Sequence, residues 1–345
     1  PVPVGPYING LDVEIGEARG SIFFGEIGEG DDTVTGNAGD NQLDGLGGDD
    51  LVQGLAGDDT ILASEGDDTF DGGSENSGEG SGDTVDYSGS DGRIDANLET
   101  GVAQGLDLEG FADLDGRIVT PTVPENNGTD ELINIENIIG TEVDDQRQIS
   151  DKLIGNEKNN TLVGLGGVDY IDGKEGDDTL LGGNGADVII GGAGDDNIDG
   201  GADGLPVPSN PFSDVPGTLT GDWVVYKGTG PLVVDLMAGL AESEDEGDDQ
   251  LSNIENVFGS FGDNVLIGDG NNNQLFGRDG VDEIIGNGGD DILSGGGGDD
   301  EIDGGADNDT ALYAGTDTDY TVTDLGGGNY TVTDNNAADG DEGTD

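Results

Sequence analysis

The sequence predicts an all-β fold of short parallel strands stacked in coils, and two observations carry this prediction. The first is a nine-residue period: residues 173–199 read GKEGDDTLL, GGNGADVII and GGAGDDNID, with Gly first, Gly fourth, Asp sixth and an aliphatic residue eighth. A fixed short period indicates a stack of identical units. The second is the chemistry of one unit, in which a Gly- and Asp-rich turn precedes a very short strand.

Each pair of consecutive nonamers is expected to form one coil, because a turn and a strand repeated twice bring the chain back on itself. Stacked coils place their strands side by side in parallel and bury the eighth residues in a line. In the first array those residues are Val34, Leu43, Val52, Ile61 and Phe70. Nine residues cannot bury enough surface alone, so the array is cooperative.

The sixth-position carboxylates then lie above one another along the turn edge, where they would repel each other. A hard divalent cation between turns removes that repulsion. Calcium fits best, because it accepts six to eight oxygen ligands in flexible geometry, whereas magnesium demands near-ideal octahedral geometry. Zinc is disfavoured because the chain has no Cys and no His. The repeats therefore predict multiple calcium ions as the cofactor.

These nonamers resemble the nonapeptide G-G-x-G-x-D-x-U-x of the repeats-in-toxin (RTX) family, the hemolysin-type calcium-binding repeat. The resemblance implies a right-handed parallel β-roll with calcium between its turns, ligated by sixth-position side chains and by turn carbonyls near the fourth-position Gly. The sixth-position residues are Asp32, Asn41, Asp50, Asp59, Asp68, Asn160, Asp169, Asp178, Asp187, Asp196, Asn264, Asn273, Asp282, Asp291, Asp300 and Asp309. The fourth-position glycines are Gly48, Gly57, Gly66, Gly176, Gly185, Gly194, Gly280, Gly289 and Gly298.

The arrays divide the chain into three rolls in tandem, separated by small β cap or linker segments that each end in an IEN motif. We expect the IEN segments to cap the open edge of a roll, and Asn at the sixth position to make a weaker, uncharged site. The predicted order is a lead-in (1–15), first roll (16–73), cap or linker (74–152), second roll (153–201), cap or linker (202–258), third roll (259–312), and a hairpin with an acidic tail (313–345).

Composition excludes several classes of partner. The 345 residues include 70 Gly, 78 Asp and Glu but 9 Lys and Arg, for a net charge of −69. This charge makes nucleic acid an unsuitable partner, and no apolar run has the length for membrane insertion. Cys is absent, so calcium is expected to supply the stabilisation that disulfides give other secreted proteins.

The chemistry of an enzyme is not evident. Without His there is no Ser-His-Asp triad and no His-based zinc protease motif. Trp223, Tyr226, Tyr87 and Tyr313 are expected to be core residues of the cap segments, with a sugar-binding platform as the alternative. The fifth-position aspartates are expected to face water rather than calcium: Asp49, Asp58, Asp177, Asp195, Asp290 and Asp299.

The sequence therefore predicts a non-catalytic, secreted protein that folds when it binds calcium outside the cell. We expect a structural role at the cell surface or in the extracellular matrix, as a layer, fibre or adhesin stalk that assembles with copies of itself. Two alternatives stay open: the calcium-binding tail of a secreted lipase, protease or alginate epimerase, and a carbohydrate-binding adhesin. The RTX resemblance adds the type I secretion machinery as a partner.

Overall fold

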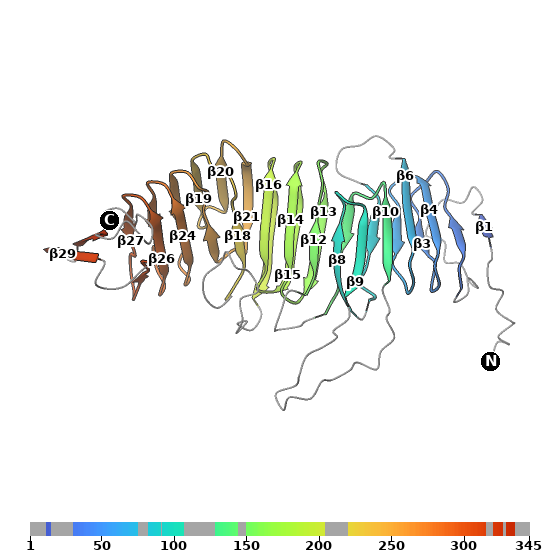
Figure 1. The fold of residues 1–345 in the computed structure, drawn as a ribbon, viewed down its shortest axis with the longest axis horizontal. Helices are drawn as coiled ribbons and strands as arrows, with labels where there is room; N and C mark the ends of the chain where they lie inside the picture. Colours follow the sequence, from blue (N-terminus) through green and yellow to red (C-terminus); the bar gives the residue numbers. More distant parts are fainter. Residues whose placement is uncertain are drawn as a thin grey trace, which may run out of the picture. The chain divides into compact units, whose positions relative to one another are not determined.

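The computed structural model describes residues 12–14, 30–74, 82–90, 92–106, 128–143, 150–203, 220–314, 320–326 and 329–334. The chain forms two compact units, Pro1–Glu175 and Gly176–Asp345. In the described residues of both units the regular structure is β-strand (Figure 1). No helix of these residues has the length and apolarity to cross a membrane.

The first unit contains two sheets in which most strands run in parallel. One has the order β1-β2-β4-β6-β10-β9-β8-β12-β14 and the other β13-β11-β7-β5-β3. The strands are β1 (Asp12–Glu14), β2 (Thr33–Thr35), β3 (Gln42–Asp44), β4 (Leu51–Ala56), β5 (Thr60–Leu62), β6 (Thr69–Ser74), β7 (Thr84–Asp86), β8 (Arg93–Asn97), β9 (Val102–Leu106), β10 (Thr129–Ile133), β11 (Asn137–Ile139), β12 (Lys152–Ile154), β13 (Thr161–Gly166) and β14 (Tyr170–Glu175).

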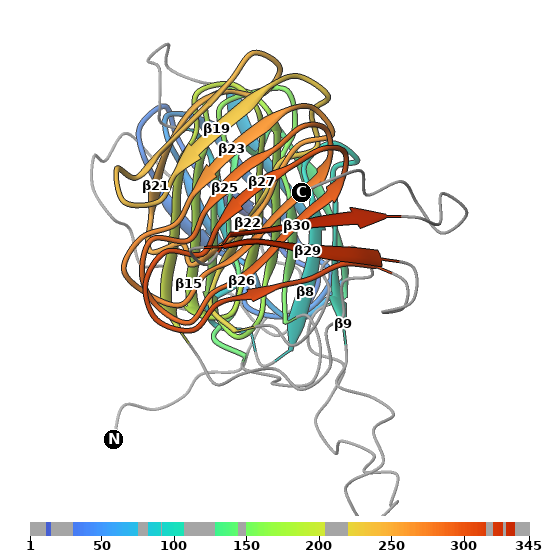
Figure 2. The same ribbon diagram turned by 90° about the vertical axis from the view of Figure 1, so that its left-hand side faces the viewer.

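The second unit repeats this plan with the orders β16-β18-β22-β24-β26-β28 and β27-β25-β23-β19-β20-β21-β17-β15. Figure 2 shows β19, β23, β25 and β27 as neighbours in one sheet. The strands are β15 (Thr179–Gly185), β16 (Val188–Ala193), β17 (Asn197–Asp203), β18 (Trp223–Val225), β19 (Leu232–Asp235), β20 (Leu240–Ser243), β21 (Gly247–Ser252), β22 (Asn256–Phe258), β23 (Asn264–Ile267), β24 (Gln274–Asp279), β25 (Glu283–Ile285), β26 (Ile292–Gly297), β27 (Glu301–Asp303) and β28 (Thr310–Ala311).

The two-nonamer coil is confirmed by the strand register. Strands that pair in one sheet come from alternate nonamers, so Val34 lies opposite Val52 and Val52 opposite Phe70. In the second unit Leu180 pairs with Ile198 in the same way. The eighth-position side chains stack into a core between the two sheets, and those of the first array are at most 1% exposed. The fold is therefore an all-β parallel β-roll.

The interruptions continue the stack. In the first unit β7 and β11 pair in parallel with each other and with repeat strands on either side. The expectation that the IEN segments cap an open edge is wrong, because β11 lies between β7 and β13, and the second IEN strand, β22, lies between β18 and β24. The interruption segments have an aliphatic residue at the same depth as the repeats, which lets their strands enter the register.

Each interruption also inserts a three-stranded antiparallel meander into one sheet. In the first unit β8 pairs with β9, and β9 with β10, before β10 rejoins β6 in parallel. In the second unit β19, β20 and β21 form the same arrangement and β21 rejoins β17. Residues 93–97 of the first interruption, which alternate in burial, form β8. Because the meander replaces repeat strands without ending the sheet, the roll passes through it.

The segments at the ends follow the prediction where the structure describes them. Residues 12–14 form β1, which pairs in parallel with β2, and the rest of the 1–15 lead-in and the degraded nonamer of residues 16–24 lie outside the described residues. The predicted C-terminal hairpin is confirmed as β29 (Tyr320–Gly326) and β30 (Asn329–Asp334), which pair antiparallel.

Three of the four aromatic residues predicted to be core residues of the cap segments are buried, whereas Tyr313, which follows the third array, is half-buried. Trp223 and Tyr87 are fully buried, and Tyr226 is 2% exposed. Trp223 packs against Phe276 with ring centroids 5.7 Å apart. A fully buried indole cannot stack on a sugar, so the sugar-binding platform predicted as the alternative around Trp223 is wrong.

Glycine at the fourth position of a nonamer is required by the backbone. Gly289 has φ of +114°, and a Cβ at this residue would lie 2.4 Å from the carbonyl oxygen of Asn271 in the preceding coil. Its neighbour Gly288 has open space where a Cβ would be and needs no left-handed backbone. Gly288 and Gly289 can therefore be compared directly, because they are adjacent in one turn and only Gly289 needs to be glycine.

We predict that Gly289→Ala lowers the stability of the calcium-loaded protein by about 1–3 kcal/mol, because it combines left-handed backbone strain with a clash against a neighbouring coil. Gly288→Ala should change it by less than about 0.5 kcal/mol. Denaturant unfolding followed by circular dichroism measures both. Equal effects of the two substitutions would contradict this account of the turn.

Candidate metal centre

The sixth-position side chains form a ladder along the turn edge of each unit. One carboxylate oxygen, Oδ1, accepts the backbone N–H of the sixth residue in the preceding coil. Asp50 Oδ1 accepts the N–H of Asp32 at 2.7 Å, and Asp68 Oδ1 accepts the N–H of Asp50 at 2.8 Å. Asp291 accepts that of Asn273 at 2.7 Å. The ladder fixes each carboxylate in orientation and buries it against the next coil.

At many positions of the ladder the second carboxylate oxygen, Oδ2, has no hydrogen-bond partner among the described residues. The Oδ2 atoms concerned are buried and accept no hydrogen bond from the described residues; they belong to Asp50, Asp59, Asp196, Asp222, Asp282 and Asp291. A buried ionised oxygen without a partner is costly, unless a cation supplies the missing interaction. These orphaned oxygens therefore fit a bound metal ion.

Glycine at the first position opens the space beside these oxygens. A Cβ built on Gly54 would lie 2.1 Å from Asp59 Oδ2 and 2.6 Å from the carbonyl oxygen of Gly72, one coil further on. A Cβ on Gly286 would meet Asp291 Oδ2 at 2.3 Å and the Gly304 carbonyl at 2.5 Å. A side-chain carboxylate and a backbone carbonyl thus converge where only glycine leaves room, a donor set that suits calcium.

The fourth-position glycines expected as ligands lie in the same turns. All nine have positive φ. A Cβ on Gly66 would lie 2.0 Å from the Gly48 carbonyl oxygen of the preceding coil, so these residues stack directly on one another. Ligation by their carbonyls remains a prediction, whereas the approach of first-position carbonyls to the carboxylates was not expected.

Burial changes the acidity of the ladder. The pKa of Asp50 and that of Asp59 are raised to about 6: removal from water raises them most, a backbone N–H donor lowers them, and neighbouring carboxylates raise them. The pKa of Asp68 and that of Asp196 rise to about 7 for the same reason. Without a cation these carboxylates therefore take up protons near neutral pH.

Residues of the interruptions extend the ladder, and sequence reasoning missed them. Each stands at the same depth as a sixth-position residue and accepts or donates the same hydrogen bond; they are Asp83, Asp130, Glu136, Asp151, Asp222, Asp249 and Glu255. The aspartates begin the short sequence Asp-x-aliphatic, as in D-T-V at Asp83 and D-Q-L at Asp249. That half-motif, with a fourth-position glycine retained before Asp130 (Gly128) and before Asp249 (Gly247), was the available signal.

The asparagines of the ladder behave differently from the aspartates. The amide of Asn273 donates from Nδ2 to the Glu255 carbonyl at 2.8 Å while its Oδ1 accepts the N–H of Asp269. Asn160 makes the equivalent bond to the Glu136 carbonyl, also at 2.8 Å. Asn264 donates to backbone carbonyls as well, and the Oδ1 of Asn41 accepts a backbone N–H. At Asn41, Asn160 and Asn273 the side-chain oxygen nevertheless faces the same space as Oδ2 of the aspartates: a Cβ on Gly36 would lie 2.3 Å from Asn41 Oδ1 and 2.5 Å from the Gly54 carbonyl oxygen. Ligation by these three amides stays a prediction, whereas Asn264 turns its Nδ2 toward the Gly277 carbonyl.

Where the ladder reaches each meander, a tyrosine hydroxyl donates a hydrogen bond to the second carboxylate oxygen of an aspartate. The hydroxyl of Tyr87 donates to Asp130 Oδ2 at 2.9 Å, and that of Tyr226 donates to Asp249 Oδ2 at 2.9 Å. The oxygen that is orphaned at Asp50 and Asp291 is therefore occupied at Asp130 and Asp249. These rungs are satisfied by the protein itself.

The fifth-position aspartates lie at the surface or half-buried, as predicted, and form a second ladder that was not expected. Asp49 Oδ1 accepts the backbone N–H of Asp67 at 3.0 Å, and Asp290 Oδ1 accepts that of Asn308 at 3.0 Å. These bonds join successive coils outside the buried column. Because the side chains remain in contact with water, they add negative potential without demanding a cation.

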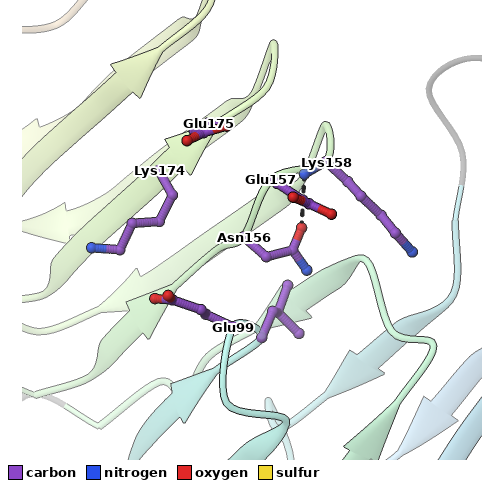
Figure 3. Close-up of a pocket in the computed structure, with 7 residues that line it drawn as sticks. Glu99, Asn156, Glu157, Lys158, Lys174 and Glu175 are labelled. Carbon is purple, nitrogen blue, oxygen red and sulfur yellow. Dashed lines mark hydrogen bonds between the residues drawn. The ribbon is translucent and has the colours of Figure 1, made fainter.

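A surface pocket of the first unit is lined by charged side chains of both signs, including Lys158, Lys174, Glu99 and Glu175. Figure 3 shows the two lysines pointing in opposite directions. Lys174 pairs with Asp172 at 2.8 Å and Lys158 with Glu136. Both ammonium groups are thus engaged with carboxylates of the roll.

The family comparison agrees with the geometry. The RTX calcium-binding nonapeptide repeat (4 copies) matches residues 28–52, 44–77, 149–180, 172–204, 252–284 and 276–311. No curated protein matches the chain significantly. The matched segments coincide with the three arrays that build the buried carboxylate ladder. The chain therefore carries the RTX calcium-binding nonapeptide in three arrays, and repeats of this kind bind multiple calcium ions.

Proposed function

We propose that this chain is a non-catalytic, secreted structural protein whose folding is driven by calcium. The observation that carries the proposal is the column of buried carboxylates whose second oxygens lack a protein partner. We assign calcium to the buried sixth-position aspartates, together with first-position carbonyls. The RTX repeat is typical of secreted proteins, and millimolar extracellular calcium matches the affinity of extracellular calcium modules.

The same column explains why folding waits for calcium. The chain carries −69 at neutral pH, and the roll brings its carboxylates to 18-residue spacing in one line. Without cations the extended chain separates these charges and solvates them, so it is favoured. Binding free energy then becomes folding free energy, because the sites exist only in the stacked coils.

A structural role is favoured over an enzyme tail by the extent of the roll and by its edges. In the second unit, β27 pairs with β25 alone among the described strands, so its other edge is open to another strand. An open parallel edge is suited to pairing with a second copy of the chain, as in a layer, fibre or stalk. Export by type I secretion follows from the resemblance to RTX proteins.

We predict that calcium, but not magnesium, converts the metal-stripped chain from coil to β-structure near millimolar concentration. Far-UV circular dichroism measures the conversion, and light scattering recorded alongside reports assembly. Scattering that rises with the β-signal supports the structural role. A β-signal without scattering favours the tail of a secreted enzyme, and a spectrum that ignores calcium contradicts the proposed function.

We predict that Asp291→Asn reduces the number of calcium ions bound per chain and moves the calcium midpoint of folding to higher concentration. Asp291 is 1% exposed and its Oδ2 lacks a partner, so its charge is required at the site. The matched control is Asp290→Asn, which removes the same charge from the exposed neighbouring residue. If both substitutions shift the midpoint equally, total charge rather than ligation determines calcium sensitivity.

We predict opposite effects of acid on the two forms of the protein. In the metal-free roll the pKa is about 6 for Asp50 and Asp59 and about 7 for Asp68 and Asp196, against 3.8 ordinarily. Folding therefore raises their pKa, so the metal-free roll gains stability as the pH falls through that range and loses it as the pH rises. The metal-stripped chain should show more β-structure at about pH 5 than at about pH 8.

Calcium binds the deprotonated carboxylates, so calcium and protons compete for the folded roll, whereas the unfolded chain stays ionised at these pH values. At about pH 5, where the metal-free roll is expected to be folded with these carboxylates protonated, calcium binding should release protons. Circular dichroism at fixed ionic strength measures the β-structure at each pH, and titration in weakly buffered solution measures the protons released. A β-rich metal-free chain that binds calcium at about pH 5 without releasing protons would show that carboxylates with raised pKa values are not the ligands.

A further inference from the structure

In each unit the carboxylate ladder meets an IEN segment at one place, which we call a corner. The first corner contains Asp83 and Glu136, and the second contains Asp222 and Glu255. In the first, Asp83 donates its N–H to Glu136 at 3.2 Å; in the second, Asp222 donates to Glu255 at 2.8 Å. Asn134 and Asn253 each donate a side-chain hydrogen bond to an aspartate of a repeat strand. The corners therefore share a backbone plan, and their differences are informative.

The first corner contains its own cation. Lys158, at the fourth position of its nonamer, places its ammonium group on Glu136 Oε1. Its backbone N–H bonds to the side chain of Asn156 at 2.8 Å. In the second corner the equivalent backbone N–H belongs to Asn271, which bonds to Asp269 at 2.7 Å. The second corner thus has an uncharged amide at the place of the lysine.

Among the described residues, the second corner contains a third carboxylate. Asp203, at the end of β17, joins Asp222 and Glu255, and carboxylate oxygens of the three residues lie within 4.8 Å of one another. Asp222 is 1% exposed, and its Oδ2 has no hydrogen-bond partner in the described part of the chain. Three carboxylates at this separation repel each other strongly unless a cation lies among them.

The space beside Asp222 has the shape of a ligand site. A Cβ built on Gly200 would lie 2.1 Å from the carbonyl oxygen of Asn253 and 2.6 Å from Asp222 Oδ2. Both oxygens therefore face one small space that only glycine leaves open. Glu255 accepts the Asp222 N–H through Oε2, which holds its carboxylate beside that space. An all-oxygen donor set with three carboxylates suits a hard divalent cation, and calcium in particular.

We propose that Asp203, Asp222 and Glu255 bind one calcium ion at the corner between the second interruption and the third array, and that Lys158 neutralises Glu136, the counterpart of Glu255, in the first corner. The site combines carboxylates from three separate segments, and Asp222 lies outside the matched nonapeptide segments. The inference rests on the proposed calcium-dependent folding. It assigns an ion that locks the interruption onto the repeats, where the first corner uses an ion pair.

The test compares bound calcium per chain, by equilibrium dialysis and metal analysis at saturating calcium, for the full chain and its variants. The double variant Asp203→Asn/Glu255→Gln should bind one ion fewer and remain folded, because Asp203 is exposed and Gln keeps an oxygen that can accept the Asp222 N–H. Glu136→Gln, the matched control in the first corner, should lose none. Asn271→Lys should also bind one ion fewer, because its ammonium group would occupy the place that Lys158 fills.

The position of the ion can be read from the single tryptophan. Trp223 follows Asp222 directly, so selective excitation of Trp223 should sensitise luminescence of terbium bound at this corner. The double variant should lose most of that emission and Glu136→Gln should keep it. Unchanged stoichiometry and emission in the double variant would overturn the proposed site while calcium-driven folding stands. Absence of calcium binding in the parent chain would instead overturn the proposed function.

Discussion

The structure depends on which group contacts the second oxygen, Oδ2, of each buried carboxylate in the ladder. The ladder of N–H···Oδ1 bonds stacks the coils and holds each aspartate in one orientation, and in doing so it buries a charge that the backbone only half satisfies. At Asp50, Asp59 and Asp291 no protein group completes the carboxylate. The hydrogen bonds that build the roll thus create the demand for a cation.

The chain meets that demand in several ways along one column. Tyrosine hydroxyls complete Asp130 and Asp249, and asparagine amides replace the carboxylate at positions such as Asn160 and Asn273. Lys158 contributes an ammonium group to Glu136. These positions cluster at the interruptions and at the openings of arrays, whereas the interiors of arrays contain carboxylates such as Asp50, Asp59 and Asp282, whose Oδ2 has no partner among the described residues. Under the proposed function, calcium dependence is therefore concentrated within the arrays and at the Asp222 corner.

The sequence was sufficient to predict the coil, the core and the identity of the cation, because each follows from a period that repeats many times. Gly, Asp and an aliphatic residue at fixed positions leave one arrangement that buries the aliphatic side chains and stacks the carboxylates. The continuous passage through the interruptions was not predictable in this way. Asp83 and Asp249 keep the strand half of the motif, but of the two turn glycines each keeps only one, Gly78 at the first position and Gly247 at the fourth.

The asparagines and tyrosines show a second limit of sequence reasoning. Asn at the sixth position offers an oxygen and a nitrogen, and the period does not say which one faces the ladder. In the structure the neighbouring carbonyl of Glu255 selects the nitrogen of Asn273, because an amide N–H₂ satisfies a carbonyl and an amide oxygen does not. The contact of Tyr226 with Asp249 joins residues 23 apart through an antiparallel meander that no periodicity encodes. The repeat therefore determines where a side chain lies in the roll. The segment in the neighbouring coil determines which group that side chain contacts.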